Sequence, residues 1–120
     1  MRMLFGLMIS TAVSAWPLSE AAGQTYCYDR IGGNKATVNG ATLGSTGILT
    51  EDAATSASFD GVDDYLSIAD ASNLDTGDTF SFFAVIKRTA AGTKHYIAHK
   101  GTGAWGLYVS AADALTFEEV

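Results

Sequence analysis

Three aspartates in one short segment, Asp60, Asp63 and Asp64, are the first candidates for chemistry. Calcium takes six to eight oxygen ligands, and carboxylates supply them, so these side chains could contribute to a calcium site. Aspartates in a tight turn also accept hydrogen bonds from nearby backbone amides. Because three carboxylates in one tight hairpin cannot all converge on an ion, the sequence favours turn capping over calcium binding.

Three aromatic residues, Tyr96, Trp105 and Tyr108, are the candidates for a surface on which a carbohydrate could stack. A flat apolar ring with a polar edge suits the C–H face of a pyranose. In a strand, Trp105 and Tyr108 are three residues apart and point to opposite faces, so at most one of them faces a given ligand. Packing in the core is the alternative role for each ring.

The two histidines, His95 and His99, have the spacing of a metal pair on a helix. In a strand they would share a face, but their Cα atoms would be about 13 Å apart, which is too far for one metal ion. We therefore expect both to be solvent-exposed strand residues.

Two further patterns do not predict catalysis. The segment Gly101–Gly106 fits G-x-G-x-x-G, but a strand follows it and too little chain remains for a ribose-binding acid. Glu118 and Glu119 are adjacent, so in a strand they point to opposite faces and cannot act as the paired carboxylates of a retaining glycosidase. With no Ser/His/Asp or Cys/His constellation either, we expect a protein that is not an enzyme.

Composition and charge further limit the class of protein and the partners it can bind. The 120 residues include 48% hydrophobic and 17% charged residues, which predicts one ordinary domain that is neither disordered nor membrane-embedded throughout. A formal net charge of −6 opposes attraction to nucleic acid or anionic lipid. No basic residue lies between Lys35 and Lys87, where acids concentrate, so this stretch forms either solvated loops or a surface for a cation or cationic partner. The lone Cys27 excludes an intramolecular disulfide.

Residues 1–15 have two interpretations. Met1 to Ile9 form a short positive region and an apolar run, and Val13 to Ala15 resemble a cleavage site, which together indicate a signal peptide and export. Alternatively, Leu7 to Leu18 form the first strand of the domain. The apolar run is too short to span a bilayer, so membrane insertion is not expected.

Short β-prone runs separated by glycines predict an all-β protein. The clearest run is Thr79–Arg88, in which apolar residues lie on both faces at period two, as in a central strand of a packed sheet. A single helical turn is expected within Asp70–Leu74. Further strands are expected at Ser56–Phe59, Asp64–Ala69, Lys94–His99, Ala104–Ser110 and Ala114–Glu118. The absence of long amphipathic helices favours an antiparallel β-sandwich.

Three segments in this order, Trp16–Gly23, Ser58–Ile68 and Thr79–Lys87, resemble the laminin-G-like, concanavalin A-like jelly-roll superfamily. The resemblance runs from about Val13 to Phe117, and we take 13–120 as one such domain. Its most specific part is Phe-Asp-Gly followed by Asp-Asp-Tyr, a recurrent hairpin signature of the family.

The hairpin signature has a physical interpretation in this chain. Gly61 would supply the positive φ that the turn requires. Asp60 and Asp63 would bond amides of the turn. The resemblance implies that Phe59, Tyr65 and Ile68 anchor core faces. Members of the family usually run longer, so we expect a copy that lacks C-terminal strands and leaves apolar faces and strand edges uncovered.

The resemblance implies recognition outside the cell. We expect a non-catalytic module that binds a glycan or a surface protein and is secreted or virion-associated. The alternative is a structural component of a phage tail or extracellular assembly, and a third interpretation is a glycosidase fragment whose catalytic strand lies beyond Val120. The oligomeric state stays open.

The same resemblance bears on cofactors. Relatives often hold calcium at a sheet rim, but pentraxin-type relatives place ligands in the loop that here reads Gly101-Thr102-Gly103, which has no carboxylate. The clustered Glu-x-Asp-x-x-Glu strand motif of glucanases with this fold is missing as well. We expect no cofactor other than calcium at the aspartate segment.

Overall fold

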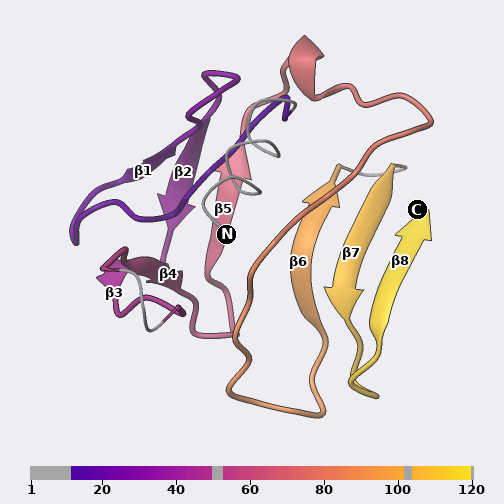
Figure 1. Cartoon of the computed structure of the whole chain (residues 1–120). Helices are drawn as coiled ribbons and strands as arrows, with labels where there is room; N and C mark the ends of the chain where they lie inside the picture. The colour runs from indigo at the N-terminus through magenta and orange to yellow at the C-terminus, as the bar shows by residue number, and fades with distance from the viewer. Residues whose placement is uncertain (1–11, 50–52, 102–103, 120) are drawn as a thin grey trace. The chain divides into compact units, whose positions relative to one another are not determined.

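The computed structural model describes residues 12–49, 53–101 and 104–119, which form an all-β structure (Figure 1). Every strand pair among them is antiparallel. The chain divides into two compact units, an N-terminal unit, Met1–Ser81, and a C-terminal unit, Phe82–Val120. The elements are β1 (Tyr26–Tyr28), β2 (Lys35–Asn39), β3 (Thr42–Ser45), β4 (Ser56–Ser58), β5 (Tyr65–Ile68), the 3₁₀ turn η1 (Ser72–Leu74), β6 (His95–Lys100), β7 (Trp105–Val109) and β8 (Leu115–Glu119).

The N-terminal unit contains a three-stranded sheet in the order β1-β2-β5 and the two-stranded pair β3-β4. Its core is small and consists of three buried residues. Cys27 and Ala36 pair directly across β1 and β2, and Leu43 is buried with them. Half-buried residues that pack around them are Trp16, Leu18, Val38, Ala57 and Leu66. Burial and the nearby Glu20 carboxylate raise the pKa of the Cys27 thiol to about 11, so this cysteine has the character of a packing residue.

The Asp29 carboxylate organises the loop between β1 and β2. Its Oδ1 accepts hydrogen bonds from the backbone N–H groups of Ala15, Ile31 and Gly32, each at 2.9 Å, and its Oδ2 accepts from Asn34. Partial burial opposes ionisation of this group, but these N–H donors outweigh it and hold the pKa of the Asp29 carboxyl well below its ordinary value. One side chain thus ties the segment before β1 to the loop that leads into β2.

The C-terminal unit contains a three-stranded sheet in the order β6-β7-β8 (Figure 1). β7 is the central strand and pairs along its whole length with β8. Its pairing with β6 shifts register between Tyr96 and Ala98, which marks a β-bulge. Residues opposite each other in this sheet share a face, so the bulge decides which β6 side chains lie on which face.

The sequence predicted several of these elements and missed others. Five of the expected strands, all those from Ser56 onward except Thr79–Arg88, correspond to β4, β5, β6, β7 and β8, and the expected helical turn corresponds to η1. The segment 12–18 contains no strand, and the rest of the expected Leu7–Leu18 strand lies outside the described residues. No helix in the described part of the chain has the length and apolar character needed to cross a membrane.

The expectation of a central strand at Thr79–Arg88 is wrong, because this segment joins no sheet. An alternating pattern becomes a strand only when neighbouring backbones supply ladder hydrogen bonds, and the sheets of the described residues do not include this segment. Four of its large apolar side chains, those of Phe82, Phe83, Val85 and Ile86, are instead exposed by 47% to 63%.

Replacing the Asp29 carboxylate tests whether it holds the N-terminal unit together. The substitution Asp29→Asn should lower the free energy of unfolding by about 2 kcal/mol, because several backbone amides lose a charged acceptor. Urea denaturation followed by tryptophan fluorescence measures the change, and Asp70→Asn, at an exposed aspartate, is the matched control.

The contribution of Asp29 to the stability of the fold decreases as the pH is lowered. Because the pKa of Asp29 is lower in the folded chain than in the unfolded chain, its contribution is complete above about pH 4 and is lost as the pH falls below that value. The Asp29→Asn variant should therefore lose less stability than the wild type on acidification below pH 4. An equal loss in both proteins would contradict this role.

Candidate functional site

Polar and aromatic side chains gather on one face of the β6-β7-β8 sheet, which we call the tyrosine face. Tyr96 lies opposite Tyr108, and Tyr108 lies opposite Thr116. Two residues away along β7 and β8, His99 lies opposite Gly106, and Gly106 lies opposite Glu118. The tyrosine face therefore comprises Tyr96, His99, Gly106, Tyr108, Thr116 and Glu118.

The aromatic rings of this face are in contact. The ring centroids of Tyr96 and Tyr108 are 5.3 Å apart with planes tilted by 56°, and the His99 ring meets Tyr96 edge-on at 5.7 Å. Tyr96 remains 54% exposed. The exposed ring of Tyr96 is thus held between the rings of Tyr108 and His99.

The carboxylate of Glu118 links the two tyrosines. The Tyr108 hydroxyl donates a hydrogen bond to Glu118 Oε2 at 3.0 Å, and the Tyr96 hydroxyl donates to Oε1 at 3.5 Å. Donation to Glu118, together with partial desolvation and the negative charge of Glu118, raises the pKa of Tyr108 above its ordinary value. The phenol therefore stays protonated and continues to donate to the carboxylate.

The ammonium of Lys94, the residue just before β6, completes the cluster. Its Nζ lies 3.7 Å from the centroid of the Tyr108 ring and 4.5 Å from that of Tyr96. The same atom is 3.5 Å from Glu118 Oε1. The Tyr96 side chain and the nearby Glu118 charge raise the pKa of Lys94 and favour its charged form.

Gly106 forms the floor of this cluster. A Cβ atom added there would lie 3.4 Å from both His99 Cδ2 and Tyr96 Cε1 and 3.6 Å from Glu118 Oε1. These three side chains therefore converge over the one position of the face that has no side chain. The arrangement combines flat rings, a carboxylate, an ammonium and an imidazole at a solvent-exposed surface, which suits binding more than bond-breaking chemistry.

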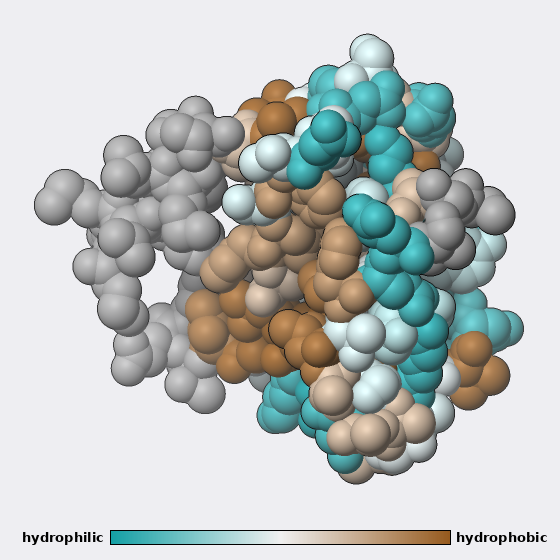
Figure 2. Space-filling view, turned by 90° about the vertical axis from the view of Figure 1, so that its right-hand side faces the viewer, coloured by the Kyte–Doolittle hydropathy of each residue, from teal (hydrophilic) through white to brown (hydrophobic). Residues whose placement is uncertain are grey.

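The opposite face of the sheet carries mainly apolar side chains, and its polar members are His95, Lys100 and Glu119. Trp105 lies there and contacts the rings of Phe82 at 6.3 Å and Phe117 at 6.2 Å. An open groove of about 270 Å³ is lined by Phe82, Phe83, Ala84, Ile86, Ile97, Leu107 and Leu115. Figure 2 shows hydrophobic residues gathered in one area of the molecular surface beside a strip of hydrophilic residues.

The three aromatic residues predicted from the sequence are thus divided between the faces. Trp105 and Tyr108 point in opposite directions, as their spacing predicts, and Tyr96 joins Tyr108. The expectation that the two histidines share a face is wrong, because the bulge between them adds one residue and turns His95 to the opposite face while His99 stays on the tyrosine face. His95 is also half-buried, whereas His99 is exposed as expected.

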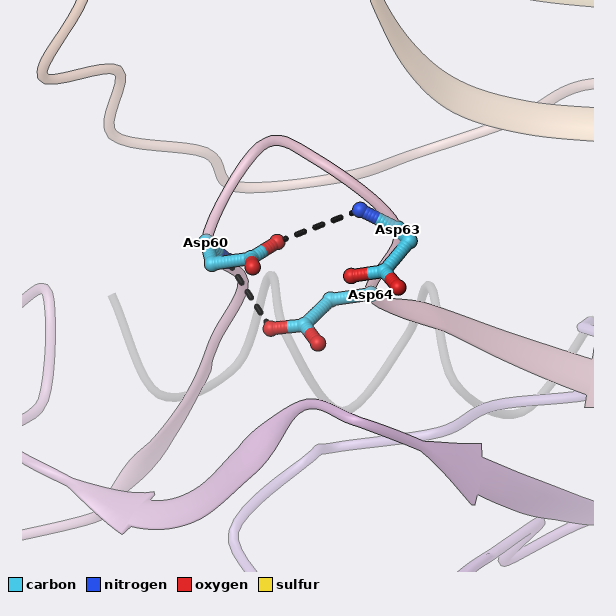
Figure 3. Close-up of side chains that lie close together, drawn as sticks. All are labelled: Asp60, Asp63 and Asp64. Atoms are coloured by element: carbon cyan, nitrogen blue, oxygen red, sulfur yellow. Dashed lines mark hydrogen bonds between the residues drawn. The ribbon is translucent and has the colours of Figure 1, made fainter.

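The aspartates lie in the N-terminal unit, in the turn between β4 and β5 (Figure 3). Oxygen atoms of Asp60, Asp63 and Asp64 lie within 4.8 Å of one another. Asp60 Oδ1 accepts hydrogen bonds from the Val62 and Asp63 amides, and the first of these does most to lower the pKa of Asp60. Asp64 Oδ2 accepts from the Asp60 amide, so two of the three carboxylates cap the turn.

The turn differs from the expected hairpin in three respects. Gly61 has a positive φ, as expected, with a value of 79°, but Asp64, and not Asp63, is the second carboxylate that bonds a turn amide. β4 pairs with β3 and β5 pairs with β2, so the turn does not join two paired strands. The expected core anchors, Phe59, Tyr65 and Ile68, are exposed by 39% to 57% and so do not anchor a core in this structure.

Sequence reasoning missed Lys94, His99 and Glu118 as members of one site. Glu118 carried a usable signal, since alternation along the last strand separates it from Glu119. The position of Lys94 over the rings has no comparable signal, because it depends on the cross-strand pairing of two tyrosines and on the bulge.

Comparison with known proteins adds no further assignment. No family model matches the chain, and neither the curated proteins nor the solved structures contain a significant match.

The hydrogen bond between Tyr108 and Glu118 can be tested by titration. The substitution Glu118→Gln should lower the pKa of Tyr108 toward its ordinary value, because it removes the negative charge that accepts the phenol proton. The ¹³Cζ resonances of the tyrosines, assigned with Tyr108→Phe, report each phenol separately. Glu119→Gln removes the same charge from the opposite face and should leave the titration of Tyr108 unchanged. An unchanged titration in Glu118→Gln would exclude the contact.

Proposed function

We propose that this chain is a non-catalytic recognition module that binds carbohydrate through the tyrosine face. The observation that carries the proposal is the pair Tyr96 and Tyr108, whose rings touch across two strands and are flanked by Glu118, His99 and Lys94. Sugar rings present apolar C–H faces edged by hydroxyl groups. An exposed aromatic ring surrounded by hydrogen-bonding side chains complements both features.

The polar groups around the rings are suited to orient a sugar. Glu118 already accepts two tyrosine hydroxyl groups and so lies fixed at one edge of the rings. The His99 ring meets the Tyr96 ring edge-on, and the side chains of His99, Tyr96 and Glu118 pack over the buried Gly106. Preorganised groups reduce the ordering cost of binding, which matters for a shallow surface of this kind.

The fold we propose is a jelly-roll sandwich of the laminin-G-like, concanavalin A-like type. Antiparallel sheets with one apolar and one polar face are compatible with sandwich layers, since the apolar faces pack inward. The sequence resemblance, from about Val13 to Phe117, supports the specific topology and a location outside the cell or on a virion.

The second candidate function is structural, as part of an extracellular or phage-tail assembly. The exposed apolar side chains around the groove favour it, because large uncovered apolar patches are typical of contacts between proteins. In that case a neighbouring protein would contact the apolar face, and the tyrosine face would have no ligand.

Glycan binding by the full chain tests the proposal. A glycan array followed by calorimetry should find a ligand with a dissociation constant between about 1 mM and 1 µM. Tyr96→Ala should weaken its binding at least about 10-fold, because the exposed ring is lost. Tyr26→Ala is the matched control, since Tyr26 is another half-exposed tyrosine that carries a lysine, Lys35, over its ring.

Two outcomes would contradict the proposal. One is a chain with a native circular dichroism spectrum that binds no glycan on the array. The other is an equal loss of binding in the Tyr26→Ala control, which would place the ligand away from the tyrosine face.

A further inference from the structure

We infer that the tyrosine face selects glycans that carry a free amino group, and that Lys94 occupies the ammonium position when no ligand is bound. This inference rests on the proposed function and names the class of sugar. It predicts that the same face distinguishes an amino sugar from its N-acetylated form.

The position of the Lys94 ammonium carries the inference. Nζ lies over two aromatic rings, at 3.7 Å from the Tyr108 centroid and 4.5 Å from the Tyr96 centroid. It also lies 3.5 Å from a carboxylate oxygen of Glu118. The electron-rich faces of two tyrosine rings and one carboxylate all attract a cation. The face therefore already holds an ammonium group in a site of suitable chemistry.

Lys94 is a displaceable occupant of that site. It precedes β6 and takes no part in the strand ladder, so its side chain can leave without a change in the sheet. Its side chain is 40% exposed and that of Glu118 is 35% exposed. Exposed ion pairs contribute little to stability, so exchanging one ammonium for another has a small cost. A sugar amine that replaced Nζ would keep the contact with Glu118 and add stacking on Tyr96.

The negative net charge of the chain also favours a positively charged ligand. A formal charge of −6 attracts a polymer with repeated positive charges and repels one with negative charges. This long-range attraction raises the association rate and weakens with added salt, because mobile ions screen exposed charges. Attraction by net charge alone would be weakened equally by the loss of Glu118 or of any other exposed acid. A larger effect of Glu118 than of another acid therefore distinguishes a specific site from net charge.

The experiment compares two ligands of equal length, an oligomer of glucosamine and the matching oligomer of N-acetylglucosamine, by calorimetry on the full chain. The wild type should bind the glucosamine oligomer at least about 10-fold more tightly. Glu118→Gln should reduce this preference to within about 2-fold, because it keeps the shape of the side chain and removes the charge. Glu119→Gln changes the net charge equally on the opposite face and should keep the preference.

The variant Lys94→Met tests the displacement step separately. It should bind the glucosamine oligomer about 3-fold more tightly than the wild type or better, because no internal ammonium competes with the ligand. Lys87→Met, at an exposed lysine outside the tyrosine face, should show the smaller gain expected from net charge alone.

The outcomes separate the two proposals. Equal binding of both oligomers, or an equal loss of preference in Glu118→Gln and Glu119→Gln, would overturn the amino-sugar inference and leave glycan binding in place. Weaker binding by Lys94→Met would also overturn it, since Lys94 would then help to hold the ligand. Failure of the folded chain to bind either oligomer or any glycan on an array would overturn both.

Discussion

The β-bulge in β6 is the constraint on which the site depends. Beyond the bulge, Ala98 lies opposite Leu107 and His99 opposite Gly106; before it, Tyr96 lies opposite Tyr108. Regular pairing continued from Ala98 would bring Ile97 opposite Tyr108 and turn Tyr96 to the apolar face. The extra residue thus allows two adjacent apolar residues, Ile97 and Ala98, to serve the apolar face while Tyr96 and His99 serve the other.

The bulge also explains why charged groups can gather on this sheet. Once Tyr96 and Tyr108 are neighbours, their hydroxyl groups both reach Glu118, and their ring faces form a surface on which the Lys94 ammonium lies. Each contact is weak at an exposed position, but the groups restrain one another, which gives the face a defined geometry. On the opposite face, the apolar side chains of Leu107 and Leu115 line the groove.

The sequence predicted the parts of the fold that depend on local pattern. Alternation and glycine spacing indicated β4 to β8, but β1, β2 and β3 were missed. The buried residues of β1 and β2, Cys27 and Ala36, are small and give little hydrophobic contrast with their neighbours. The alternation at Thr79–Arg88 was as regular as any, yet a ladder also needs a partner strand. Spacing alone separated Trp105 from Tyr108, whereas the pairing of Tyr96 with Tyr108 required the bulge, which no local pattern specifies.

The measurement that tests this account most directly is a set of nuclear Overhauser effects between side chains of the C-terminal unit. Cross-peaks are expected between the rings of Tyr96 and Tyr108, and between the Ile97 methyl groups and those of Leu107 or Leu115. Cross-peaks from the Tyr96 ring to the Val109 methyl groups, with Ile97 close to Tyr108, would indicate a regular strand without the bulge. The tyrosine face would then not exist, and both proposals built on it would fail.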